Sequence, residues 1–293
     1  MGYHEPGMGE QLKENLRMLE LQEETSQTVW ETYKRKPASF ERAAKEAYAG
    51  ELPDYPICKR SPLERLVIWC CHLTQLRIRM SRFPYEVLTD TWRDITLRAG
   101  LYREKTGRVG LSREDVLWFR HLEHGVLFKL GTLQFQMFRM VYLDEAGCGE
   151  AYMSFSEEQK QRLPPESPVL NVHVQAGADL TGEAVANSFR RADVFFQTYF
   201  PEHKARVFLC YSWLLYPDLR ALLPPESRIA QFAQNFTIIS QVPDPEEALE
   251  RIYGKRRPRK ADCLQETSLQ RAALNRRDCL GYACGILEIP QTT

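Results

Sequence analysis

The sequence has no excess of charge of either sign, because 39 lysines and arginines balance 39 aspartates and glutamates. Nucleic-acid binding depends on cationic side chains that contact phosphates, so the balance gives no indication of nucleic acid or of an anionic membrane as a partner. The sequence also lacks an uninterrupted run of the roughly 20 apolar residues needed to cross a bilayer, and residues 1–17 lack the apolar core of a signal peptide. We therefore expect a soluble, cytoplasmic protein.

The cysteine spacing of a metal or redox motif is absent too. The eight cysteines occur at positions 58, 70, 71, 148, 210, 263, 279 and 284, and none forms a CxxC motif. Cys70 and Cys71 fall within an apolar helical pattern, where a thiol packs as a small hydrophobic group. The spacing matches no structural zinc site, so we expect reduced cysteines and no metal.

The segment RHLEHG, residues 120–125, is the one place that looks like a metal motif. His121 and His124 stand three residues apart around Glu123, and no third ligand lies nearby in the sequence. Histidines near the end of a helix are stabilised by the helix dipole. We interpret the motif as such a helix end.

Residues 1–124 show the apolar spacing of amphipathic helices and hardly any strand pattern. The clearest helix begins with a capping box of Ser61 and Glu64, and another begins at Ser112 with Asp115. Ser39 is expected to cap a helix that ends at Gly50. Further helices are expected around residues 12–19 and from 84 to 100. These five helices predict a helical domain over residues 1–124.

At Gly125 the apolar period changes from near four to two, which predicts a second domain over residues 125–293. Residues 126–142 fit two antiparallel strands or one long strand bent at Gly131. On either interpretation Gln134 and Gln136 lie on the face opposite to Leu133 and Phe135.

Residues 169–215 predict a right-handed βαβ unit. In residues 169–175 apolar side chains alternate with Asn171, His173 and Gln175, which is typical of a strand with one polar face. A helix follows with Thr181 as its N-cap, and residues 207–215 form an apolar run that is typical of a buried parallel strand. The carboxyl ends of two such strands meet at one edge, and such edges bind ligands. The residues expected there are His173, Gln175, Ala176, Gly177, Cys210, Tyr211, Ser212 and Trp213.

Four segments, HGVLFKLGTLQFQ, LNVHVQAG, CYSWLL and TSLQRA, resemble bacterial proteins that combine an N-acyltransferase N-terminal domain with a GNAT-like C-terminal domain. The resemblance implies an α/β (α+β) fold with a mixed β-sheet and a small-molecule substrate. It also implies that acyl-CoA is the co-substrate and that an acceptor, such as an amine, enters between the domains. The cofactor-binding residues implied by the resemblance are Gln175, Ala176, Gly177, Thr181, Gly182, Ser212 and Trp213. Where the superfamily signature has two glycines after the glutamine, this chain has Ala178 and Leu180.

Acyl transfer to an amine needs a base, and His173 has a suitable side chain. Tyr211 is the candidate acid for the departing thiolate, and Cys210 is a candidate nucleophile in a relay with His173. We expect Gln134 and Asn171 to border the substrate cavity. In the alternative interpretation His173 only bonds Gln134 or another cross-strand neighbour, and Tyr211 and Cys210 are core residues.

Two alternative functions remain open. The missing glycines favour a non-catalytic GNAT-like module that binds a small molecule or regulates another protein. A Rossmann-type nucleotide binder is disfavoured because no GxGxxG motif occurs. The basic segment KRRPRK, residues 255–260, is interpreted as a solvated loop rather than a phosphate or partner site.

Overall fold

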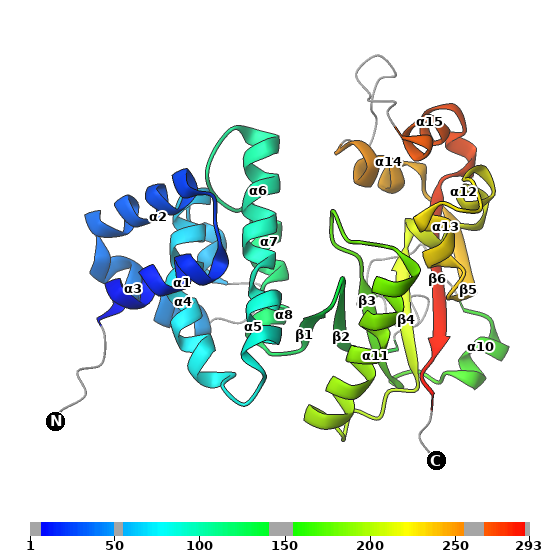
Figure 1. The fold of residues 1–293 in the computed structure, drawn as a ribbon, viewed down its shortest axis with the longest axis horizontal. Helices are drawn as coiled ribbons and strands as arrows, with labels where there is room; N and C mark the ends of the chain where they lie inside the picture. The colour runs from blue at the N-terminus through cyan, green and yellow to red at the C-terminus, as the bar shows by residue number, and fades with distance from the viewer. Residues whose placement is uncertain (1–6, 50–54, 141–154, 255–266, 291–293) are drawn as a thin grey trace. The chain divides into compact units, whose positions relative to one another are not determined.

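The computed structural model describes residues 7–49, 55–140, 155–254 and 267–290. The basic segment 255–260 therefore lies outside the described residues. The chain divides into two compact units, Met1–Lys129 and Leu130–Thr293. Figure 1 shows a helical first unit and a second unit built on a sheet.

Helix α4 is the centre of the first unit and carries nine buried residues. Its capping box forms as predicted: the amide of Glu64 donates to the Ser61 hydroxyl at 3.4 Å, and the Ser61 amide donates to the Glu64 carboxylate at 3.1 Å. Helices α1, α2 and α3 pack against it. The elements of this unit are α1 (Met8–Leu19), α2 (Glu23–Arg35), α3 (Pro37–Ala49), η1 (Pro56–Lys59), α4 (Pro62–Arg79), α5 (Tyr85–Trp92), α6 (Asp94–Thr106), α7 (Arg113–Trp118) and α8 (Arg120–Glu123).

Two local predictions for this unit are wrong, and one helix is not predicted at all. Helix α2 has only three buried residues, and its pattern was not recognised as a helix. Ser39 lies inside α3, which begins at Pro37, because proline fits the first helical turn. The expected helix from 84 to 100 breaks after Trp92, and α6 then continues through Gly100.

A six-stranded mixed sheet forms the second unit, with strand order β1-β2-β3-β4-β6-β5. Strand β3 runs parallel to β4, whereas β2 is antiparallel to β3 and β6 is antiparallel to both β4 and β5. The predicted mixed α/β fold is thus confirmed. The strands are β1 (Leu127–Leu130), β2 (Leu133–Arg139), β3 (Pro168–His173), β4 (Val207–Ser212), β5 (Thr237–Pro243) and β6 (Gly281–Glu288).

The turn between β1 and β2 depends on a glycine. Gly131 has φ +80°, and a Cβ atom there would lie 2.5 Å from the Ser188 hydroxyl. That hydroxyl also accepts a hydrogen bond from the Thr132 amide at 2.8 Å. The turn is therefore fixed against helix α11 (Gly182–Tyr199). Of the two predicted arrangements, two strands rather than one bent strand is correct.

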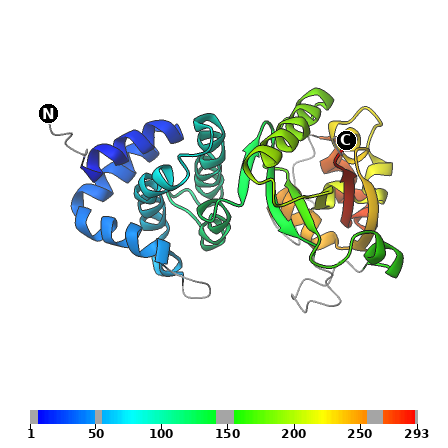
Figure 2. The same cartoon turned by 90° about the horizontal axis from the view of Figure 1, so that it is seen from below.

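Helix α11 connects β3 to β4 and covers one face of the sheet (Figures 1 and 2). The ring of Phe189 lies 5.8 Å from that of Phe135 and 4.8 Å from that of Phe208, measured between centroids. These contacts lie on the apolar side of an amphipathic helix. The predicted βαβ unit is confirmed.

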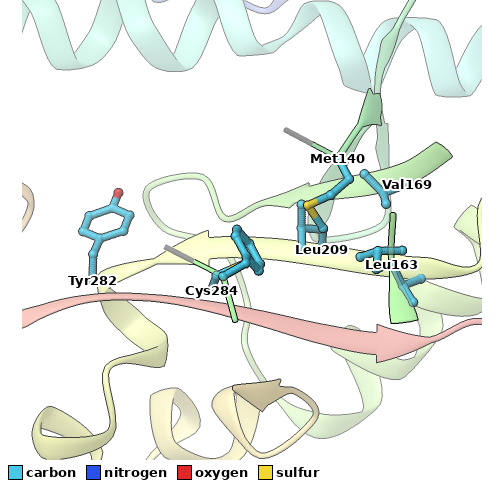
Figure 3. Packing of buried hydrophobic residues seen from close by; sticks show 8 residues of the cluster. Met140, Leu163, Val169, Leu209, Tyr282 and Cys284 are labelled. Atoms are coloured by element: carbon cyan, nitrogen blue, oxygen red, sulfur yellow. The ribbon is translucent and has the colours of Figure 1, made fainter. Parts of the chain in front are cut away.

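The opposite face of the sheet carries a separate apolar cluster, shown in Figure 3. It includes Val169 and Leu209, whose side chains alternate with those that face α11. Leu163 joins it just after helix α10 (Glu157–Arg162). The buried members are Met140, Phe155, Leu163, Val169, Val207, Leu209, Tyr282 and Cys284.

Short helices follow β4 and β5 and precede β6. The apolar run predicted as one strand to residue 215 leaves the sheet at Ser212. A capping box of Thr267 and Gln270 begins the last of these α-helices. Within the described ranges, no helix is long and apolar enough to cross a membrane. The elements are η2 (Trp213–Leu215), α12 (Pro217–Leu222), α13 (Arg228–Ala233), α14 (Pro245–Tyr253), α15 (Ser268–Asn275) and η4 (Arg277–Cys279).

Candidate active site

Strands β3 and β4 are adjacent and parallel, as predicted, and their pairing stops before either strand ends. Leu170 pairs with Phe208 and Asn171 with Leu209, but β3 continues to His173 and β4 to Ser212. In contrast, the antiparallel pairing of β2 with β3 continues to His173. The two parallel strands therefore part at their carboxyl ends, where backbone groups of both become available to a ligand.

Four polar side chains lie together on one face beside this divergence. Gln134 is directly opposite His173, and Gln136 is directly opposite Asn171. Because strand residues alternate between faces, all four share the face that carries Leu209 and not the face under α11. We call Gln134, Gln136, Asn171 and His173 the polar quartet.

Within the polar quartet, His173 and its diagonal cross-strand neighbour Gln136 are hydrogen-bonded. His173 Nε2 lies 2.9 Å from Gln136 Oε1, and an amide oxygen can only accept, so Nε2 donates. In the neutral ring the lone pair is then on Nδ1. The alternative interpretation of His173 predicts a hydrogen bond to Gln134 or another cross-strand neighbour, and the structure shows this bond to Gln136.

The other diagonal of the polar quartet carries two buried atoms without a partner. Gln134 is 1% exposed and Asn171 is 8% exposed. Among the described residues, neither Gln134 Nε2 nor Asn171 Oδ1 has a hydrogen-bond partner. Buried polar atoms are nearly always paired, with protein, water or ligand. An available donor and an available acceptor thus flank His173.

The candidate residues of β4 separate onto two faces. Continuing the parallel register from Asn171 and Leu209 places Tyr211 on the same face as His173. Its hydroxyl donates to the sulfur of Met140 at 3.9 Å. Cys210 points to the opposite face and is 1% exposed, and burial raises the pKa of its thiol to about 12. The predicted relay between Cys210 and His173 is therefore wrong, because the sheet separates the two groups.

Ser212 and Trp213 mark the end of β4. The Ser212 hydroxyl accepts a hydrogen bond from the Leu214 amide at 3.1 Å and so caps η2. Trp213 is half-buried and belongs to η2, not to the strand as predicted. Both remain near the divergence of β3 and β4, but the Ser212 oxygen already has a structural partner.

The turn after β3 brings the remaining predicted residues to the start of α11. Gly177 has φ +74°, and the Ala178 amide donates to the Gln175 carbonyl at 3.2 Å. Ala176 and Gly182 are exposed, and Gly182 is the first residue of α11. Backbone N–H groups at such a helix start favour an anion.

Thr181 is the N-cap residue of α11, as predicted, but its side chain does not cap the helix. The hydroxyl and the amide of Thr181 both bind the carboxylate of Asp179, each at 3.1 Å. Arg228 lies 3.5 Å from the same carboxylate. Sequence analysis missed Asp179. Its place close to Thr181 at a predicted helix start was the available signal.

The RHLEHG motif proves to be part of a buried ionic cluster in the first unit. His72 Nε2 donates to Glu123 at 2.7 Å, and the Arg120 guanidinium pairs with the other carboxylate oxygen of Glu123. Glu123 and His72 are completely buried side chains. The interpretation of the motif as a dipole-stabilised helix end is incomplete, because its acid is the centre of the cluster. In the part of the chain that the structure describes, no group of three or more potential metal ligands lies together.

Comparison with solved structures shows the same fold in acyltransferases. An acyltransferase in complex with decanoyl-CoA and teicoplanin is 23% identical, with a TM-score of 0.72 over 96% of this chain and 88% of the other. A mutant acyltransferase in complex with octanoyl-CoA is 22% identical, with a TM-score of 0.73 over the same shares. An acyltransferase in complex with CoA and 10C-teicoplanin gives 22% and 0.72, again over 96% and 88%. Comparison with curated proteins finds no match.

The model of the GNAT-like C-terminal domain family matches residues 127–281. This range is more than half of the chain, and it contains the polar quartet, the turn after β3 and the diverging parallel strands. The resemblance inferred from sequence segments is confirmed, and the chain belongs to the family of proteins with a GNAT-like C-terminal domain.

Proposed function

We propose that the chain transfers an acyl group from an acyl-CoA to an amine. The observation that carries the proposal is the polar quartet beside the diverging strands, with His173 between the unpaired atoms of Gln134 and Asn171. The fold shared with acyltransferases crystallised with acyl-CoA supports it. An enzyme that binds an ammonium group and removes its proton needs an acceptor and a base side by side. Asn171 and His173 supply them.

The proposed reaction removes protons from the acceptor nitrogen and delivers one to the departing thiolate. His173 accepts a proton from the substrate ammonium at Nδ1, the nitrogen that carries the lone pair while Nε2 donates to Gln136. The amine then attacks the thioester carbon, so the C–N bond forms, the nitrogen gives up its second proton to solvent, and the C–S bond breaks. Tyr211 donates its phenolic proton to the departing thiolate, which leaves as the CoA thiol. Solvent returns the proton from the His173 imidazolium to Tyr211.

The turn at residues 175–182 would hold the pyrophosphate of the acyl-CoA. The donors are the backbone N–H groups at the start of α11, and Gly177 and Gly182 leave the backbone open to a ligand. The pantetheine would lie between the parting ends of β3 and β4, beside Ser212 and Trp213. Gln134 and Asn171 would contact the acceptor.

A non-catalytic binding module is the second candidate, and one observation favours it. The Asp179 carboxylate accepts a hydrogen bond from the Thr181 amide at the helix start. It therefore competes with a phosphate for this donor, and its negative charge repels the phosphate. Ala178 and Leu180 replace the glycines of the superfamily signature in the same turn. A protein with this turn can keep the fold and lose tight CoA binding.

Ligand-dependent melting separates the two candidates from a nucleotide binder. A ligand at about a hundred times its Kd stabilises the folded state by about 2.7 kcal/mol. We expect acyl-CoAs to raise Tm and nicotinamide nucleotides to leave it unchanged. An unchanged Tm with every member of a panel of CoA thioesters at millimolar concentration would refute CoA binding.

Turnover then separates the enzyme from the binding module. The measurement is thiol release from acyl-CoA in the presence of an amine panel that includes teicoplanin, which a structural neighbour binds. His173→Ala should lower turnover by about 10²- to 10⁴-fold, with little change in Tm because His173 is only half-buried. A variant that melts early and keeps its turnover would show a structural histidine instead.

A further inference from the structure

The second unit contains a cavity of about 420 Å³ that the proposed reaction does not use. Its walls come from the last two turns of α11 and from residues 200, 201 and 203–206, which lead into the amino end of β4. Because β3 and β4 are parallel, this end of the sheet is the one opposite to the diverging carboxyl ends.

The inner wall of the cavity is apolar and well packed. Leu170, Phe196, Phe200 and Ile289 line it, and all four are buried. The rings of Phe196 and Phe200 also contact each other, with their centroids 5.7 Å apart. The backbone of Ile289 is fixed by a hydrogen bond to the Arg206 carbonyl at 2.9 Å. Such a wall favours the hydrocarbon part of a ligand.

The mouth of the cavity is cationic. Lys204 and Arg206 are exposed, and neither forms an ion pair or side-chain hydrogen bond with any residue in the described ranges. Lys204 has φ +41°, a backbone conformation that residues with side chains adopt infrequently. The acidic residue at the cavity is Asp193, whose carboxylate accepts a hydrogen bond from Gln197 at 2.6 Å. Two cations and one acid leave a net charge of one positive.

We propose that this cavity binds a small amphiphilic carboxylate, with its hydrocarbon body on the Phe196 and Phe200 wall and its carboxylate on Lys204 and Arg206. A net charge of plus one matches a monoanion better than a phosphate dianion. The volume lies at the lower end of the range of about 300–1,000 Å³ for small-molecule pockets, which suits a chain of about eight carbons. The site is independent of the acyl-transfer proposal.

Titration calorimetry on the full chain with octanoate tests the proposal, with 1-octanol and octylamine as matched neutral and cationic probes. We expect octanoate to bind at least tenfold more tightly than octanol, and octylamine not to bind. The double variant Lys204→Gln/Arg206→Gln should lose at least tenfold in octanoate affinity. Both side chains are exposed, so Tm should stay unchanged. Arg162→Gln, an exposed cation on α10, serves as the control and should bind as the unmodified chain does.

Competition between octanoate and CoA shows which of the two sites octanoate occupies. Octanoate should bind equally well with saturating CoA and in His173→Ala, since those changes concern the other end of the sheet. Displacement by CoA would place the carboxylate at the acyl-transfer site and overturn the proposal. Equal affinity of octanoate and octanol, or an unchanged affinity in the double variant, would overturn it as well.

Discussion

Replacing Gln136 by glutamate should move the acid limb of the pH profile of acyl transfer to higher pH. Gln136 accepts the Nε2 proton of His173 at 2.9 Å and is 6% exposed. A carboxylate in the same place would favour the imidazolium, the form that cannot accept the proton of the substrate ammonium. The variant enzyme then needs a higher pH to reach the same fraction of neutral His173.

The size of the shift follows from Coulomb's law. Two unit charges about 4 Å apart interact by about 4 kcal/mol at an effective dielectric constant of 20, which corresponds to about three pH units. Partial burial opposes the charging of the new glutamate, so we expect the acid limb to rise by about one to three pH units. At a pH below the shifted limb, kcat/KM falls about tenfold for each pH unit of the shift. The rate at high pH should be retained.

Thiol release measured from pH 5.5 to 9.5 gives the two profiles. Gln136→Leu removes the acceptor without adding charge, so it should lower the plateau and leave the acid limb where it is. Gln231→Glu adds the same charge at an exposed position on α13 and should change neither feature. An acid limb that does not move in Gln136→Glu, in a variant with unchanged Tm, would show that His173 is not the base.

Three further changes test other parts of the structure. Asp179→Asn removes a carboxylate from the start of α11, so CoA should bind more tightly by about 1 kcal/mol, or about fivefold. An equal or weaker affinity for CoA would show that the phosphate does not bind at this turn. Glu123→Gln leaves the guanidinium of Arg120 buried without its anion, so the free energy of unfolding in urea should fall by about 3–5 kcal/mol. The control Glu14→Gln changes an exposed ion pair and should lower the same free energy by less than about 1 kcal/mol. Burial, aided by the charge of His124, lowers the pKa of His121, so the unfolded chain binds more protons below pH 6.5 and stability should fall with falling pH there. This loss should be smaller in His121→Gln.

The sequence predicts the second unit well where a single physical pattern decides the structure. The alternation in residues 169–175 and the helix and apolar run that follow lead directly to the βαβ unit, and the predicted capping boxes at Ser61 and Ser112 both form. In the first unit, α2 was missed because a helix with three buried residues has a weak apolar pattern. Helix α2 is stabilised by packing against α4, and such a tertiary contact is not visible in the local sequence pattern.

Only part of the candidate site could be predicted from the sequence. Alternation shows which residues of one strand share a face, but it does not show which face of the neighbouring strand lies beside them. Asn171 and His173 could be placed on one face, but which face of β4 joins them depends on the register. That register pairs Asn171 with Leu209, so Tyr211 joins His173 and Cys210 does not. A shift by one residue would have reversed the two. The hydrogen bond to Gln136 likewise depends on a diagonal contact between two strands.

The RHLEHG motif shows how a short pattern conceals a long-range contact. Glu123 lies between two histidines in the sequence, yet its partners are Arg120 and His72, and His72 is 51 residues away on α4. An isolated carboxylate at this depth would be destabilising, so the burial of Glu123 depends on the Arg120 guanidinium and on the hydrogen bond from His72. His121 instead packs its ring on Trp118 at 5.2 Å between centroids. Glu123→Gln and His121→Gln should therefore differ sharply: the first should unfold at a much lower urea concentration at any pH, whereas the second should change mainly the pH dependence of stability.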